Sequence, residues 1–213
     1  MNILHISASP SGERSDSHRL SAHVVDHLRR RVPQARIVER FLWREDAPHV
    51  DAVYTRALAS ADADAASPAL ARSDALIAEL EAADVLVIGT PMHNLTVPSA
   101  LKAWIDHVVR AHRTMRVTPQ GKVGTLADRP VYIAVSSGGM RTGPRARQPD
   151  FFEPYLRAVL PMIGLRDITL FSLEGTAAGA ERAETARVEV RGAIDAFFAD
   201  LPAAHAPLPL AAV

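Results

Sequence analysis

The sequence predicts an α/β protein built on a five-stranded, doubly wound parallel sheet. Three observations support this prediction. Short apolar runs alternate with segments of helical periodicity, which is the order expected of successive βαβ units. The run Asp84–Gly89 is apolar almost throughout, as expected of a strand covered on both faces. Apolar residues make up 48% of the 213 residues, enough for a full core.

Four of the strands are expected from short apolar runs, and residues 35–40 from an alternation of apolar and polar residues. The first such run begins almost at the first residue and is followed by a loop rich in serine. The expected strands are 2–7, 35–40, 84–89, 130–135 and 167–173.

The helices are expected where apolar residues recur every three or four positions. Leu20, Val24 and Leu28 form one such stripe. Ser67 and Pro68 have the residue types preferred at an N-cap and a first helical position. The expected helices are 17–32, 50–60, 67–80, 98–110, 150–163 and 180–198. We expect residues 112–128 to form a hairpin or a lid, residues 1–201 to form a single domain, and residues 202–213 to be a disordered tail.

Charge and composition exclude several classes of protein. The formal net charge is zero, which argues against a nucleic-acid partner. The chain has no Cys, which excludes disulfides, thiolate metal sites and Cys nucleophiles. The N-terminus does not follow the signal-peptide pattern, and no apolar run approaches the roughly 18 residues of a membrane helix. We therefore expect a cytoplasmic protein that does not bind membranes.

A ligand site is expected at the carboxyl edge of the sheet. With helices on both faces and the flavodoxin-like strand order 2-1-3-4-5, the topological switch point lies between the first and third strands. Ligands of open α/β sheets bind at this point. The loops after the first, third and fourth strands should therefore converge on one site.

The loop after the first strand predicts an anion site. Five of the eleven residues from Ser7 to Ser17 are serine, and they precede a helix N-terminus. The loop contains neither GxGxxG nor GxxxxGK[ST], so it supports neither a dinucleotide site nor a triphosphate site. Neutral donors without Lys suit a phosphate monoester. The alternative is that these serines only cap the helix.

The loops after the third and fourth strands could hold a flat ring. Met92 and Leu95 could cover such a ring, and Asn94 offers both a donor and an acceptor. Gly138 and Gly139 would allow the backbone to approach closely. Taken singly, these loops are also compatible with an ordinary turn and a flexible connection.

Several segments together resemble the FMN-dependent NADH azoreductases, also described as FMN-dependent NADH:quinone oxidoreductases. The similarity runs from the first strand to the last helix. The segments that carry it are NILHISASP (2–10), the serines of the first loop, SDALIAEL (73–80), AADVLVIGTPM (82–92), LKAWIDHVVRA (101–111) and Ser136–Gly139.

The resemblance implies a homodimer with tightly but non-covalently bound FMN at each subunit boundary. NADH or NADPH would donate electrons, and a quinone or an azo compound would accept them in a ping-pong sequence. Carried over by position, the FMN ligands are Ser9, Ser15, Asp16 and Ser17 for the phosphate end, and Met92, His93, Asn94, Leu95, Ser136, Ser137, Gly138 and Gly139 for the ring. His93 and Asn94 are the catalytic candidates, His93 as a proton donor.

The sequence departs from the family pattern at three positions. The family usually has Tyr in place of His93, Arg in place of Ser137, and often Gly in place of His112. These differences affect the expected substrate preference and flavin potential more than the FMN site itself.

Other functions are weaker alternatives. A flavodoxin-type electron carrier or a general NAD(P)H:FMN reductase would share the fold. A serine hydrolase using Ser136 or Ser137 lacks the GxSxG motif. Arg141, Arg145 and Arg147 could meet a nucleotide phosphate, although such a run is more often a solvated loop. His23 and His27 have metal-ligand spacing but no third ligand in the sequence pattern, so we expect no metal site.

Overall fold

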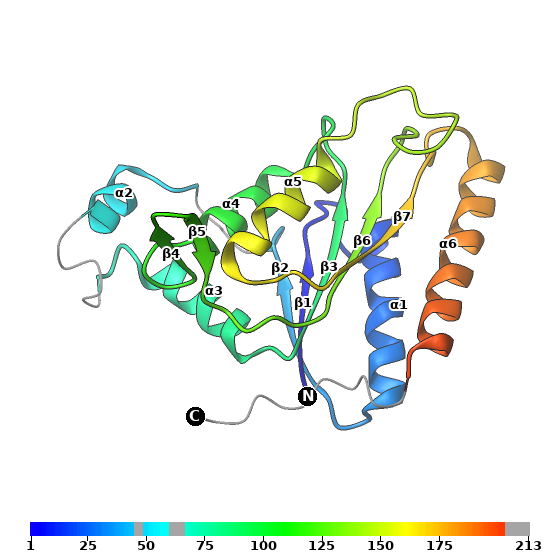
Figure 1. Cartoon of the computed structure of the whole chain (residues 1–213). Helices are drawn as coiled ribbons and strands as arrows, with labels where there is room; N and C mark the ends of the chain where they lie inside the picture. The colour runs from blue at the N-terminus through cyan, green and yellow to red at the C-terminus, as the bar shows by residue number, and fades with distance from the viewer. Residues whose placement is uncertain (45–48, 60–66, 203–213) are drawn as a thin grey trace.

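The core of the computed structural model is a parallel sheet of five strands in the order β2-β1-β3-β6-β7 (Figure 1). Its strands are β1 (Asn2–Ser7), β2 (Arg36–Phe41), β3 (Val85–Pro91), β6 (Val131–Ser136) and β7 (Ile168–Leu173). A hairpin supplies β4 and β5, so this is the predicted order 2-1-3-4-5 when only the strands of the sheet are counted. The structure describes residues 1–44, 49–59 and 67–202. The predicted disordered tail lies almost entirely outside these residues.

Helices cover both faces of the sheet (Figure 1). The helices are α1 (Asp16–Arg31), α2 (Ala52–Ala59), α3 (Ala71–Ala82), α4 (Ser99–Val108), α5 (Phe152–Val159) and α6 (Ala180–Asp200). Successive strand residues point to opposite faces, so β3 divides its side chains between two cores. Val85 and Val87 pack in the core beneath α1 and α6, whereas Leu86 and Ile88 pack in the core beneath α3, α4 and α5. Both cores are therefore built around the strand with the longest apolar run.

Two helix boundaries differ from the prediction by more than two residues. The helix expected at Ser67 begins at Ala71, because the residues before it form a turn in which the Leu70 N–H donates to the Ser67 oxygen at 2.9 Å. The helix expected to reach residue 163 ends at Val159. A 3-10 turn, Pro161–Ile163, follows it, since proline has no N–H to continue the helical ladder. Trp104 is 1% exposed and belongs to the core.

The predicted hairpin is present in the connection between α4 and β6. Its strands are β4 (Met115–Thr118) and β5 (Gly121–Gly124), and they pair antiparallel. A Cβ on Gly124 would lie 2.0 Å from the Gly164 nitrogen, so the close approach of these two backbones requires glycine. His112, just before the hairpin, has φ 65°, in the left-handed region that favours glycine.

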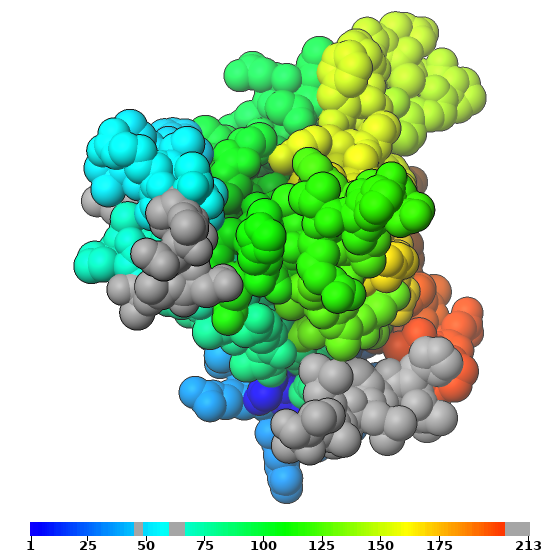
Figure 2. Space-filling view, turned by 60° about the vertical axis from the view of Figure 1, so that its left-hand side comes forward, coloured from blue at the N-terminus to red at the C-terminus, as the bar shows by residue number. Residues whose placement is uncertain are grey.

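The loop between β6 and α5 projects beyond the carboxyl edge of the sheet. It forms the yellow-green extension at the top of both Figure 1 and Figure 2. Among the described residues, no helix is long and apolar enough to cross a membrane.

Candidate functional site

Three loops meet at the carboxyl edge of the sheet, as predicted. Parallel register aligns the strand ends, with Ser7 opposite Gly89 and Pro91 opposite Ser136. The residue that follows each of β1 and β3 is hydrogen-bonded to the neighbouring strand. The Ala8 N–H donates to the Gly89 oxygen and the Met92 N–H to the Ser136 oxygen, both at 2.8 Å. The topology thus brings three loops that are far apart in the sequence to one edge of the sheet.

The loop after β1 is folded tightly against the sheet edge. Ser9 is buried, and its backbone oxygen accepts the Gly12 N–H at 3.0 Å. Gly12 has φ 61°, and a Cβ there would contact the Trp43 ring at 3.3 Å. Ser15 caps α1, its Oγ accepting the His18 N–H at 3.2 Å. One of the predicted ligand serines is therefore a helix cap as well.

The first turn of α1 leaves donors available for an anion. Among the described residues, the backbone N–H groups of Asp16 and Ser17 have no acceptor. Ser17 Oγ is buried and has no described partner either. The Asp16 carboxylate is instead held by Arg187 of α6, at 2.8 and 3.1 Å. Asp16 can therefore meet an anion only through its backbone.

Two histidines lie behind this loop and do not add positive charge to it. The rings of His5 and His18 stack with centroids 5.5 Å apart. Burial lowers the pKa of His5 to about 4, helped by the nearby His18. Burial also lowers the pKa of His18, partly offset by Glu13 and Glu39. Both rings are neutral near pH 7, so an anion here would be held by neutral donors.

A cavity of about 470 Å³ lies between the loops after β3 and β6. This volume is within the usual range for small-molecule sites. Its lining residues are Met92, Asn94, Leu95, Ser137, Gly138, Gly139 and Gln148. His93 is exposed and is not among the lining residues. Ser136 ends β6 below them and is half-buried.

The loop after β3 forms a strained turn in the wall of the cavity. Asn94 and Leu95 have φ 47° and 72°, the pattern of a type I′ turn. Reciprocal hydrogen bonds between His93 and Thr96, at 2.9 and 3.0 Å, close the turn. A leucine whose backbone is in the left-handed region lowers folding stability by about 1–3 kcal/mol, and such conformations cluster at ligand sites.

The β6 loop lines the cavity with backbone. The N–H groups of Gly138 and Gly139 have no acceptor among the residues that the structure describes. A Cβ on Gly139 would lie 2.8 Å from Gln148 Oε1, so a larger residue would intrude on the cavity wall. Ser137 Oγ donates to the Gly139 oxygen at 2.6 Å. No described histidine is hydrogen-bonded to Ser137 or Ser136, which weakens the hydrolase alternative.

Arg141 anchors this loop from beneath. Its side chain is 1% exposed and pairs with Asp150, with Glu153 at 3.3 Å and with Glu174 at 3.4 Å. It also donates to Ser172 Oγ at 3.1 Å. Both sequence-based interpretations of Arg141, a phosphate contact and a solvated loop residue, are therefore wrong, because the fold brings three carboxylates around it.

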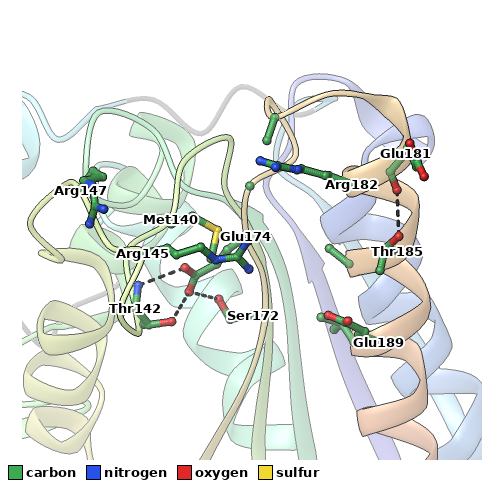
Figure 3. Close-up of a pocket in the computed structure, with 14 residues that line it drawn as sticks. Met140, Thr142, Arg145, Arg147, Ser172, Glu174, Glu181, Arg182, Thr185 and Glu189 are labelled. Atoms are coloured by element: carbon green, nitrogen blue, oxygen red, sulfur yellow. Dashed lines mark hydrogen bonds between the residues drawn. The ribbon is translucent and has the colours of Figure 1, made fainter.

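Glu174 also holds this loop, and Figure 3 shows its hydrogen bonds with Thr142 and Ser172. It accepts the N–H groups of Arg141 at 2.7 Å and Thr142 at 3.1 Å, and the Thr142 and Ser172 hydroxyls at 2.9 and 3.0 Å. Burial by itself would raise the pKa of Glu174, but these hydrogen bonds outweigh it and lower the pKa. The carboxylate therefore stays charged and holds the loop on β7.

A second cavity, of about 740 Å³, lies on the other side of the same loop, toward α6 (Figure 3). Arg145 from the loop and Arg182 from α6 both extend into it, and Glu181 and Glu189 line it as well. The lining thus carries both signs of charge. Arg147 also lines it and donates to the Pro144 and Ala146 oxygens.

Sequence reasoning missed two parts of the site. Gln148 lines the ring-sized cavity, but no motif in the Gly/Arg-rich loop distinguishes it. Glu174 directly follows a strand that was predicted, yet its pairing with Arg141 depends on how that loop folds back. Neither residue has a local signal in the sequence.

The chain is similar to several known proteins. A family model described by its flavodoxin-like fold matches residues 1–198. "FMN-dependent NADH:quinone oxidoreductase 4" of Pseudomonas fluorescens (strain Pf-5) is 47% identical over 193 residues, covering 91% of this chain and 93% of the relative. "FMN-dependent NADH:quinone oxidoreductase 5" of Burkholderia lata is 48% identical over 176 residues, covering 83% and 86%.

Solved structures support the fold. An azoreductase from Bacillus anthracis strain Sterne superimposes with a TM-score of 0.82 at 23% identity, covering 94% of this chain and all of that one. An FMN-dependent NADH-azoreductase from B. anthracis Ames Ancestor, solved in complex with FMN, gives a TM-score of 0.76 at 23% identity, covering 92% and 98%.

Proposed function

The chain belongs to the family of FMN-dependent NADH:quinone oxidoreductases, which have the flavodoxin-like fold, and from this premise we propose that it reduces quinones with electrons from NADH. The observation that carries the proposal is the convergence of unpaired donors at the carboxyl edge of the sheet. The start of α1 offers them to a phosphate, and the Gly138–Gly139 backbone offers them to a ring.

The residues present fit FMN. A phosphate monoester suits the neutral donors at the start of α1, where the buried Ser17 Oγ lacks a described partner. A cavity of about 470 Å³ suits a flat ring. FMN held by these residues would supply the redox chemistry, a two-electron exchange between the nicotinamide and the acceptor in a ping-pong sequence.

The protein's part is to bind, orient and stabilise. Ser9, Ser15 and Ser17, with the Asp16 N–H, would hold the phosphate end. Met92, Asn94 and Leu95 would form one wall for the ring, with His93 beside them. Ser136, Ser137, Gly138 and Gly139 would form the other wall, where the free glycine N–H groups can donate to the ring edge and stabilise negative charge.

His93 and Asn94 are the proposed catalytic residues. Asn94 lines the cavity and can both donate and accept a hydrogen bond. His93 is exposed beside it, where it could pass a proton between solvent and the acceptor. His93→Gln should slow acceptor reduction and change its pH dependence. Half-reactions that are unchanged at every pH would rule out the proton-donor role.

We also propose a homodimer with its sites at the subunit boundary, and azo compounds as a second class of acceptor. The exposed apolar residues Phe151 (58% exposed) and Val117 (69% exposed) are consistent with a surface that another copy covers. Sedimentation velocity should give twice the mass of one chain. A species with the mass of a single chain at micromolar concentration would reject the dimer.

The deciding experiment is the visible spectrum of the purified protein. We expect a two-band yellow spectrum that anaerobic NADH bleaches and a quinone restores. Steady turnover would separate an enzyme from a flavodoxin-type carrier. A colourless protein that binds no added FMN would refute the proposal, and a parallel NADPH titration would establish the preferred donor.

A further inference from the structure

A group of metal-ligating side chains lies between α1 and α6, two helices that run side by side (Figure 1). His23 and His27 are one turn apart on α1, and Asp195 comes from α6. The sequence spacing offers only the two histidines, because the carboxylate is 168 residues further along the chain than His27. The fold supplies the third ligand.

The three side chains converge on a single point. Nε2 of His23 lies 2.7 Å and Nε2 of His27 lies 2.6 Å from the same oxygen, Oδ1 of Asp195. All three potential ligand atoms lie within 4.8 Å of one another. The imidazole rings are 4.9 Å apart and nearly perpendicular, with an interplanar angle of 82°. Each histidine thus presents the same ring atom toward one carboxylate oxygen.

The group is held in place on its protein side and open on its solvent side. The His27 ring stacks on Phe198, with centroids 5.0 Å apart and planes at 10°. Two further contacts join α1 to α6. At the start of α1, Asp16 pairs with Arg187, and at its end Arg31 donates to the Leu201 oxygen at 2.7 Å. The histidine side chains are 18% and 12% exposed, whereas Asp195 is 55% exposed.

This donor set suits borderline divalent transition metals. Two imidazole nitrogens and one carboxylate oxygen are common ligands of Zn²⁺, whereas Ca²⁺ and Mg²⁺ prefer oxygen ligands alone. Ligand atoms at about 2.0–2.1 Å from a tetrahedral ion are about 3.4 Å apart. The present N–O distances would open by less than about 1 Å, a movement that rotation of the exposed Asp195 side chain allows.

We propose that His23, His27 and Asp195 bind a divalent transition-metal ion of the Zn²⁺ class and that this ion joins α1 to α6. Each neutral imidazole would carry its proton on Nδ1, freeing the Nε2 lone pair for the metal. Solvent water would occupy the remaining coordination positions. The site lies apart from the cavity at the sheet edge and does not depend on the proposed quinone reduction.

The test is calorimetric titration of tag-free protein, treated with chelator and then freed of it, with Zn²⁺ as the probe. We expect one site per chain, with binding at least tenfold weaker in His23→Ala and in Asp195→Asn. His49→Ala, which removes an exposed histidine elsewhere, should bind as the parent does. Ca²⁺ should give no binding at this site.

A thermal unfolding series gives a second readout, since an ion that binds only the folded state raises the melting temperature. Zn²⁺ should raise it for the parent and for His49→Ala but not for Asp195→Asn. The two ligand variants change different helices, and Asp195 is exposed, so at least one is expected to fold. Absence of one-to-one binding in the parent, or equal binding in a folded ligand variant, overturns the proposal.

Discussion

Replacing Arg141 by Ala should destabilise the protein more than any nearby surface change. The Arg141 side chain is 1% exposed and Glu174 is 6% exposed, so the substitution leaves a buried carboxylate without its cation. Breaking a buried ion pair from one side typically costs about 3–5 kcal/mol. Asp150 and Glu153 are 20% and 28% exposed and can regain water, which favours the lower half of that range, about 3–4 kcal/mol.

Urea unfolding of the flavin-free protein measures this loss directly, and thermal unfolding should show a decrease of roughly 6–16 °C for a chain of this size. Arg145→Ala is the matched control. It lies in the same loop, is exposed and has no ion pair among the described residues, so we expect a change within about 0.5 kcal/mol.

The pH dependence of the stability of Arg141→Ala tests whether an unpaired carboxylate causes the loss. Protonation neutralises the buried Glu174 carboxylate that Arg141→Ala leaves without its cation, so the loss of stability should shrink as the solution becomes more acidic. FMN titration should also show weaker binding, because the same loop carries the Gly138–Gly139 backbone. A loss of no more than about 1 kcal/mol, with an unchanged denaturant slope, would show that Arg141 does not anchor the loop.

Three further perturbations test other parts of the structure. Ser17→Ala should weaken FMN binding by about 10–100-fold in fluorescence titrations while exposed Ser11→Ala does not, and equal affinities would remove Ser17 from the phosphate site. His5 titrates near pH 4 when folded and at 6.5 when unfolded, so unfolded chains bind the extra proton and stability falls by about 3 kcal/mol from pH 6.5 to 4. His5→Gln should flatten the plot of unfolding free energy against pH in this range, as measured by urea unfolding. A plot for the variant that runs parallel to that of the parent would show that His5 is not the cause. Gly89→Ala places a Cβ 2.8 Å from the Ser17 backbone oxygen and should cost about 1–3 kcal/mol, whereas Gly192→Ala, with open space around it, should not destabilise the protein.

Much of the architecture was predictable because its signals are local. The alternation of side chains along Val85–Ile88 and the stripe of Leu20, Val24 and Leu28 follow from strand and helix geometry within a few residues. Given the strand order, the position of the three loops at one edge follows as well. The helix starting at Ala71 shows the limit, since a turn can use Ser-Pro as readily as a helix can.

The candidate site was predictable only in part. The serines of the first loop and the glycines of the β6 loop have compositional signals, but Gln148 has none. Whether Ser15 acts as a cap, or Asp16 as a salt-bridge partner, depends on backbone geometry and on Arg187 far along the chain.

The sequence by itself therefore determined the elements, their order and the edge of the sheet where a ligand should bind. Only the tertiary structure decided that Arg141 is a buried anchor and that Asp195 joins His23 and His27. The physical reason is that periodicity shows only which residues, close together in the chain, share one face of a helix or strand. Charge pairing and metal ligation instead depend on distances of a few ångströms between residues that folding brings together from distant positions.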